Sequence, residues 1–156
     1  MGLLIRSATP DDAAQLTSLA RRAKAHWGYP GPWLAAWAPQ LTIAPEYVTQ
    51  HAVLVAEVDG RLGGMCALED DGSAWSLAQV WVEPAYLGRG IGRALVERAL
   101  ALVQAVRPGR VVAVADPNAA GFYRRLGARE VSAAPAPMPG APDRVLPVFE
   151  FEVPAA

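Results

Sequence analysis

Hydrophobic residues recur along the chain with two different spacings. In residues 13–25 and 91–106 they return every three or four positions, as on one face of an α-helix. Shorter helices are predicted from Trp33 to Trp37 and over residues 118–127. Alternating or continuous apolar runs predict strands, which cover residues 3–8, 52–60, 61–72, 74–84, 110–116, 128–133 and 148–153.

The order of these elements predicts the fold class. A first strand is followed by helices, a meander of three strands, a helix, a strand, a second helix and two final strands. Asp59-Gly60 joins two strands of the meander and is a strong signal for a tight hairpin turn. The pattern predicts one mixed α/β (α+β) domain spanning residues 1–156, built around a central sheet.

Some segments allow more detailed predictions. Asn118 is interpreted as the cap of the short helix that follows it, and Gly127 as the glycine that ends this helix. The run at 110–116 is continuously apolar, which is typical of a strand buried on both faces of a sheet. Prolines are frequent in residues 133–147, which predicts a stiff, irregular loop.

Composition and charge narrow the class of protein. The chain has 156 residues, of which 53% are hydrophobic and 19% charged, so we expect a folded domain with its own core. The net charge of −1 gives no reason to expect nucleic acid or a membrane as a partner. No signal peptide or membrane-spanning run is recognised, and the single cysteine, Cys66, lies in an apolar strand, so a cytoplasmic protein with a buried thiol is predicted. His26 and His51 lack metal-ligand spacing, and no metal site is predicted.

Three glycines at alternate positions stand between a predicted strand and the helix that begins near residue 91. They are Gly88, Gly90 and Gly92. Free amides and the positive end of the dipole at a helix N-terminus favour an anion, and glycines let it approach closely, so a phosphate site is predicted beside the alternative of a merely tight turn. A dinucleotide fingerprint would need a glycine where Arg93 stands, and a P-loop needs Gly-Lys-Ser/Thr, so neither pattern fits.

Two segments resemble the GNAT acetyltransferase superfamily. "VWVEPAYLGRGIGRALVERAL" resembles the acyl-CoA-binding segment of that family, in which a strand ending in V-x-P leads to a loop R/Q-x-x-G-x-G/A and a helix. "NAAGFYRRLGA" resembles the second family motif, and a helix and a strand separate the two as the family requires. The resemblance implies a twisted, mixed, mostly antiparallel sheet of about six to seven strands flanked by helices.

The resemblance also implies roles for individual residues. Backbone groups of Val80, Trp81 and Val82 would hold the pantetheine arm of acetyl-CoA, and Asn118 would contact the same arm. Tyr123 would protonate the departing thiolate as a general acid, the alternative for its ring being core packing beside Phe122. The pyrophosphate would lie against backbone amides of Leu87, Gly88, Arg89, Gly90, Ile91, Gly92 and Arg93.

The chain departs from the family pattern at two positions. Leu87 stands where the family usually has Arg or Gln, and Arg89 is a candidate to compensate. Ala78 stands where some members carry a general base. The proton of the attacking amine must then leave through water or a more distant group, and the candidates are Glu69, Asp70, Glu83 and His26.

An aromatic segment between the first two strands is the candidate acceptor site. In this fold that segment usually lines the acceptor pocket, and here it contains His26, Trp27, Tyr29 and Trp33. Trp33 and Trp37 lie four residues apart, so packing of one helix on the sheet explains them equally well. In the late loop, Arg144 is a weaker candidate to pair with a substrate carboxylate.

The resulting hypothesis is an acetyl-CoA-dependent N-acyltransferase that moves the acetyl group to a primary amine of a small-molecule acceptor by direct attack. Two alternatives stay open: a non-catalytic acyl-CoA sensor, which Ala78 favours, and an acetyltransferase for protein N-termini or lysines. A homodimer is suggested by family analogy alone. The acceptor, the base, the oligomeric state and the pathway are not assigned from the sequence.

Overall fold

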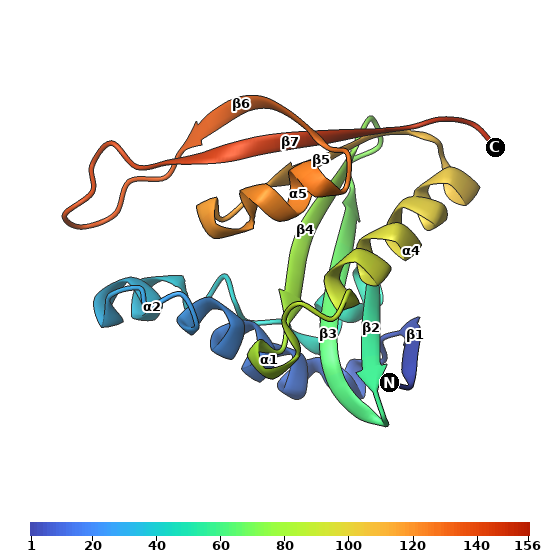
Figure 1. Cartoon of the computed structure of the whole chain (residues 1–156), viewed down its shortest axis with the longest axis horizontal. Helices are drawn as coiled ribbons and strands as arrows, with labels where there is room; N and C mark the ends of the chain where they lie inside the picture. The colour runs from blue at the N-terminus through green and yellow to red at the C-terminus, as the bar shows by residue number, and fades with distance from the viewer.

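A computed structural model describes all of residues 1–156 as one sheet of seven strands flanked by helices (Figure 1). The strand order is β1-β2-β3-β4-β5-β7-β6, and only the β4–β5 pair is parallel. This confirms the predicted fold class. None of the helices combines the length and apolar character needed to cross a membrane. The strands are β1 (Leu3–Ser7), β2 (Ala52–Val58), β3 (Arg61–Asp70), β4 (Trp75–Val82), β5 (Gly109–Val114), β6 (Arg129–Pro135) and β7 (Val145–Val153), and the helices are α1 (Ala13–Ala25), α2 (Gly31–Trp37), α3 (Pro45–Gln50), α4 (Ile91–Val106) and α5 (Ala120–Arg125).

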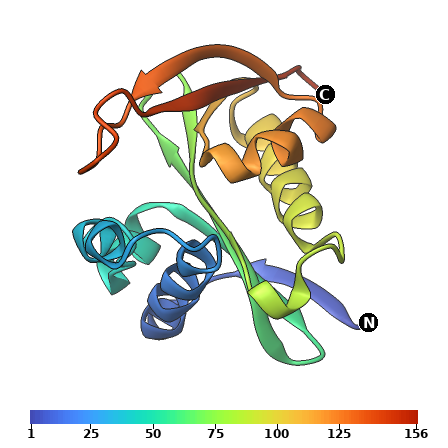
Figure 2. The same ribbon diagram turned by 60° about the vertical axis from the view of Figure 1, so that its left-hand side comes forward.

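Helices cover the two faces of the sheet with separate hydrophobic clusters. In β2, Val53 and Val55 pack on the side of α1, whereas Leu54 and Ala56 pack on the side of α4 and α5. The alternation follows from the pleat, which sends successive side chains to opposite faces. Figure 2 shows α1 and α4 on opposite sides of the sheet. Because both faces of β2 and β3 are buried, these strands are apolar almost throughout.

The sheet splits between β4 and β5. The two strands pair only at Trp75 with Val111 and at Ser76 with Val112, after which they diverge. A bulge in the β3–β4 ladder leaves Ala78 without a partner on β3. From Leu77 to Val82 the edge of β4 that faces β5 therefore has no strand beside it.

One sequence prediction about β5 was wrong. Val111 and Ala113 are fully buried, but Val114 is 54% exposed, so the strand is buried on one face and not on both. The covered face packs in the cluster that contains α4 and α5, and the opposite face is open. The continuous apolar run suggested burial on both faces, but Val112 and Val114 lie on the open face.

Two local predictions also need correction, and one helix was missed. The side chain of Asp116, not that of Asn118, caps the turn Pro117–Ala119 before α5, because it accepts a hydrogen bond from the Asn118 N–H at 2.8 Å. Residues 133–147 are not a loop throughout, since β6 continues to Pro135 and β7 begins at Val145. Helix α3 was not predicted.

Candidate active site

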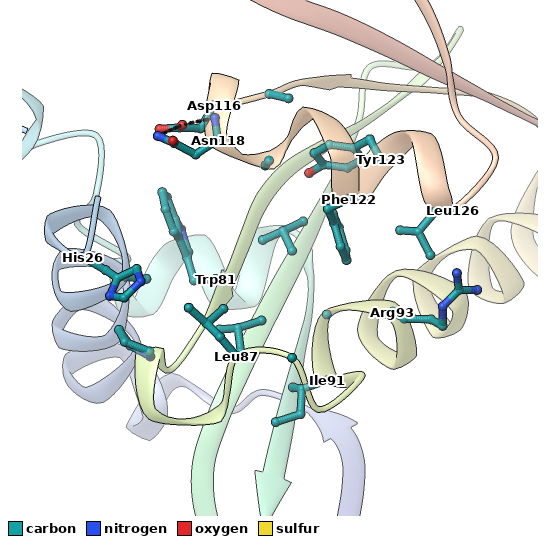
Figure 3. Close-up of a pocket in the computed structure, with 18 of the residues that line it drawn as sticks. His26, Trp81, Leu87, Ile91, Arg93, Asp116, Asn118, Phe122, Tyr123 and Leu126 are labelled. Carbon is teal, nitrogen blue, oxygen red and sulfur yellow. Dashed lines mark hydrogen bonds between the residues drawn. The ribbon is translucent and has the colours of Figure 1, made fainter. Parts of the chain in front are cut away.

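A cavity of about 450 Å³ opens where β4 and β5 diverge (Figure 3). Its walls come from both faces of the sheet. His26 and Trp27 reach it from the end of α1 on one side, and Phe122 and Tyr123 reach it from α5 on the other. The cavity is therefore a slit through the sheet, with room for a ligand on each face.

The unpaired edge of β4 forms one wall of the slit. Val80, Trp81 and Val82 line it together with Ala78, and the first three are partly buried. Since no strand pairs with this edge, its backbone groups are free to bond an extended ligand, as in strand addition. The three residues predicted to hold the cofactor arm thus lie at the slit.

The glycine loop forms the end wall, and its glycines serve two different purposes. Gly88 and Gly90 have φ angles of +80° and +79°, in the left-handed region, and a Cβ on either would meet no atom within 4 Å. Gly92 lies in the first turn of α4, where a Cβ would come 3.0 Å from Cε1 of Phe122. Gly88 and Gly90 hold the loop conformation, and Gly92 lets α4 approach α5 closely.

The N-terminus of α4 opens onto the slit. Gly90 is its cap residue, and Gly88, Gly90, Ile91 and Gly92 all line the cavity. The first amides of a 16-residue helix therefore lie beside this end of the slit. Leu87 also lines the cavity, with 43% of its surface exposed.

The guanidinium groups of the two arginines at the glycine loop and the start of α4 contact other parts of the protein. The guanidinium of Arg89 lies 5.3 Å from the ring centroid of Tyr86, and Arg89 is not among the cavity-lining residues. Arg93 lines the cavity, but its guanidinium donates to Glu97 at 3.1 Å and to the carbonyl of Arg125 at 3.2 Å. In this conformation Arg89 does not replace the missing contact at Leu87.

Tyr123 lies between the core and the slit. Its ring is 5% exposed and packs at 5.1 Å from Phe122 and 5.5 Å from Phe149, measured between ring centroids. Figure 3 shows its hydroxyl directed toward the cavity that the residue lines. Burial raises the pKa of this phenol well above its usual value, so the group stays protonated and can donate.

A polar network closes the slit at the end of β5. Asp116 accepts from Lys24 Nζ at 2.6 Å and from the Tyr29 hydroxyl at 2.8 Å, and the side-chain amide of Asn118 donates to it at 2.9 Å. Hydrogen bonds from Lys24 and the Asn118 N–H lower the pKa of Asp116 although burial opposes this. Asp116 and Asn118 both line the cavity. Sequence reasoning missed Asp116, whose only signal is a carboxylate directly after an apolar strand.

The predicted acceptor residues fall into two groups. His26 and Trp27 line the slit, whereas Tyr29 and Trp33 do not. Tyr29, Trp33 and Trp37 pack against one another beside it, with ring centroids 4.9 to 5.9 Å apart.

Cations of the chain itself occupy this aromatic cluster. Lys24 Nζ lies 4.3 Å from the ring centroid of Trp37, and the guanidinium of Arg144 lies 5.2 Å from the same centroid. Trp33 Nε1 also donates to the carbonyl of Pro139 at 3.0 Å, which ties α2 to the β6–β7 hairpin. Packing therefore accounts for Tyr29 and Trp33 in this structure.

Of the four candidates for the general base, only His26 lines the slit. Glu69 accepts from the Tyr47 hydroxyl at 2.7 Å, and Asp70 pairs with Arg107 at 2.6 Å. Glu83 pairs with Arg22 at 2.7 Å.

Comparisons with known proteins agree with the fold and the motifs. The family model described as acetyltransferase (GNAT) domain matches residues 49–127, which include β4, the glycine loop and α5. The comparison with curated proteins found no match.

Several solved structures of acetyltransferases share the fold. The PaiA N-acetyltransferase of Thermoplasma acidophilum, in complex with coenzyme A, superposes with a TM-score of 0.79 at 16% identity, over 97% of this chain and 99% of the other. YncA of Salmonella typhimurium, a putative acetyltransferase with acetyl-CoA, gives 0.73 at 21% identity, over 100% and 96%. The ribosomal-protein-S18-alanine N-acetyltransferase of Escherichia coli gives 0.74 at 16%, over 99% and 96%. From the family model, the motifs and the shared fold together, we conclude that this chain belongs to the GNAT acetyltransferase family.

Proposed function

We propose that this protein transfers the acetyl group of acetyl-CoA to a primary amine of a small-molecule acceptor. The observation that carries the proposal is the slit between β4 and β5, which joins a glycine loop at a helix N-terminus to a buried, neutral tyrosine hydroxyl. Two of the similar structures contain coenzyme A or acetyl-CoA, which supports the same ligand class here.

The residues present fit acetyl-CoA. The free edge of β4 at Val80 to Val82 suits the amides of the pantetheine arm, and the space over Gly88 and Gly90 suits the pyrophosphate. A side chain at either glycine would project into that space. We place the amides of residues 87–93 on the phosphates and Asn118 beside the arm.

Acetyl-CoA supplies a thioester as the acyl donor. The slit would hold the acceptor on the α1 side, so that the amine meets the acyl carbon from the face opposite α5. Tyr123 would donate its proton to the departing sulfur, since its hydroxyl is protonated and borders the cavity.

A covalent acyl-cysteine is disfavoured by the position of Cys66. Its thiol is 1% exposed and lies in the core against α4, where it donates to the Leu95 carbonyl at 3.6 Å. Burial raises the pKa of this thiol to about 12, so almost no thiolate forms at neutral pH. Direct attack by the amine is therefore the proposed route.

Ala78 favours one alternative, a sensor that binds acyl-CoA without catalysis, because the residue offers no base beside the thioester. A protein acceptor is the other alternative. The proposal also includes a cytoplasmic location and a single domain over residues 1–156. The homodimer remains an expectation from family analogy.

Release of free thiol from acetyl-CoA over a panel of primary amines tests the proposal, with mass spectrometry of the products. We expect thiol release that requires an amine and yields a product heavier by one acetyl group. Binding of acetyl-CoA with no turnover of any amine would favour the sensor, and acetylation of peptides alone would favour the protein acceptor.

A further inference from the structure

The C-terminal end of α1 connects the two strands that diverge at the slit. Arg22 pairs with Glu83, which directly follows β4, at 2.7 Å. Two residues later, Lys24 pairs with Asp116 beyond the end of β5 at 2.6 Å. The last turn of α1 is therefore tied to both sides of the opening.

His26 follows this turn and lies at the mouth of the slit (Figure 3). Its backbone still has helical angles, and its N–H donates to the Arg22 carbonyl at 3.1 Å, so the ring is carried by the end of the helix. The imidazole packs edge-on against Trp27, with centroids 4.9 Å apart, and neither ring nitrogen has a hydrogen-bond partner within the protein.

Four charged groups on the elements next to His26 are held in ion pairs. Arg22 and Lys24 lie on α1 itself, Glu83 follows β4 and Asp116 follows β5. They form two ion pairs, and their four charges cancel. The remaining charged residues that line the cavity, Arg93 and Arg125, belong to α4 and α5 on the far face of the sheet.

We propose that His26 is the general base of the reaction, an inference that rests on the proposed acetyl transfer. It takes the place of the base that Ala78 does not provide. Imidazole suits the task, because its neutral form has a ring nitrogen that can accept a proton. His26 lies on the α1 side of the slit, where we propose that the acceptor binds, and across the cavity from Tyr123.

The amine nitrogen bonds to the acyl carbon and gives its proton to a ring nitrogen of His26. The carbon–sulfur bond breaks, and the sulfur takes the proton of Tyr123. His26 then releases its proton to solvent, to which it is exposed, and Tyr123 regains one through water in the slit.

His26→Gln is the direct test, because it removes the basic nitrogen and keeps a polar side chain of similar reach. With acetyl-CoA and the best amine of the panel, we expect kcat to fall about 100-fold or more, in the range of general-base catalysis. The acidic limb of the pH–rate profile should disappear, while calorimetry should give the wild-type affinity for acetyl-CoA. His51→Gln is the matched control, since His51 packs on Tyr47 at the end of α3, away from the slit, and should leave both readouts unchanged.

His26→Glu separates a base from a packing role. It should restore part of the rate and move the acidic limb to lower pH, because a carboxylate is a weaker base than imidazole. If His26 only packed against its neighbours, the acidic limb of the pH–rate profile would not move in this variant. In the wild-type protein, proton NMR of the two imidazoles should show the His26 signal shifting on addition of acetyl-CoA and the His51 signal staying in place.

The outcomes distinguish this inference from the proposed function. If the wild-type protein turns over and His26→Gln keeps the full kcat and the acidic limb, His26 is not the base. The proposed acetyltransferase function would still stand. A His26 signal that acetyl-CoA does not move would also contradict the inference. Wild-type protein that neither binds acetyl-CoA nor releases thiol would overturn both.

Discussion

The ring of Tyr123 packs in the core, and its hydroxyl faces the slit. Phe122 and Phe149 flank the ring, which fixes the direction of the hydroxyl toward the cavity. The two interpretations of this residue from the sequence, core packing and general acid, are therefore compatible.

Tyr123→Phe removes the hydroxyl and keeps the packing. We expect kcat for acetyl transfer to fall by about 100-fold, the lower end of what a general acid contributes, with the affinity for acetyl-CoA nearly unchanged. Steady-state kinetics and calorimetry measure the two effects. Tyr47→Phe is the control, because its hydroxyl bonds Glu69 outside the slit, so it should lower stability by about 1 kcal/mol without slowing transfer. Equal rates for wild type and Tyr123→Phe would refute the assignment.

Gly90→Ala tests the glycine loop. Its positive φ makes any side chain strained, so stability should fall by about 1–2 kcal/mol. Affinity for acetyl-CoA should fall about tenfold or more, which corresponds to about 1.4 kcal/mol. Gly72→Ala carries a similar strain, with a φ of +92° and open space for its Cβ, but lies in the β3–β4 turn away from the slit. It should lose stability and keep its affinity, whereas equal affinity losses in both variants would argue against a phosphate cradle at Gly90.

The positions of site residues were predictable where a motif determines the backbone, and not where distant side chains meet. The glycine loop and Tyr123 were located from adjacent residues in the sequence. The hydrogen bond from Lys24 to Asp116 joins residues 92 positions apart, so no local sequence pattern predicts it. The direction of the Arg89 side chain, toward the nearby Tyr86, was also not predicted.

At the scale of elements, the position of α1 matters because its end carries His26. Its start is held by Asp12, whose carboxylate accepts two hydrogen bonds from Arg6 on β1, at 2.8 and 3.0 Å. The Thr9 N–H donates to the same carboxylate at 2.7 Å. These bonds attach the helix to the edge of the sheet.

Asp12→Asn should lower stability at neutral pH by about 1 kcal/mol, the upper end for a partly exposed ion pair. The bonds from Arg6 lower the pKa of Asp12 to about 2, below its usual value. A lowered folded-state pKa contributes stability that is present above the unfolded value and is lost as the pH falls from about 4 toward about 2. Urea unfolding across this range should show the variant and wild type converging in acid. Asp11→Asn, which removes a neighbouring carboxylate without an ion pair, should show no such convergence, and a constant gap for Asp12→Asn would contradict the account.

The elements themselves followed well from periodicity where local signals agreed. Asp59-Gly60 adopts positive φ at both residues, as the hairpin prediction requires. Helix α3 was missed because it has six residues and begins at Pro45, too short for a periodic pattern. The hairpin of β6 and β7 was underestimated because prolines at 135 and 147 sit within strands of an edge pair, where local composition favours a loop.

At the scale of the whole molecule, the split of the sheet creates the site. The order of elements predicted a central sheet and the family resemblance implied that it is mixed, but neither indicated that β4 and β5 would pair over only two residues. Helix α1 packs on one face of the sheet, and α4 and α5 pack on the other. This arrangement brings His26, the glycine loop and Tyr123 to one cavity from three distant segments.

Calorimetric titration of the wild-type protein with acetyl-CoA tests the central claim most directly, because every proposed role depends on that ligand entering the slit. We expect saturable binding at one site per chain, with a dissociation constant on the order of micromolar, in the usual range for enzyme substrates. Competition by free coenzyme A should lower the apparent affinity. Absence of binding heat at millimolar acetyl-CoA, at two temperatures, would contradict the account.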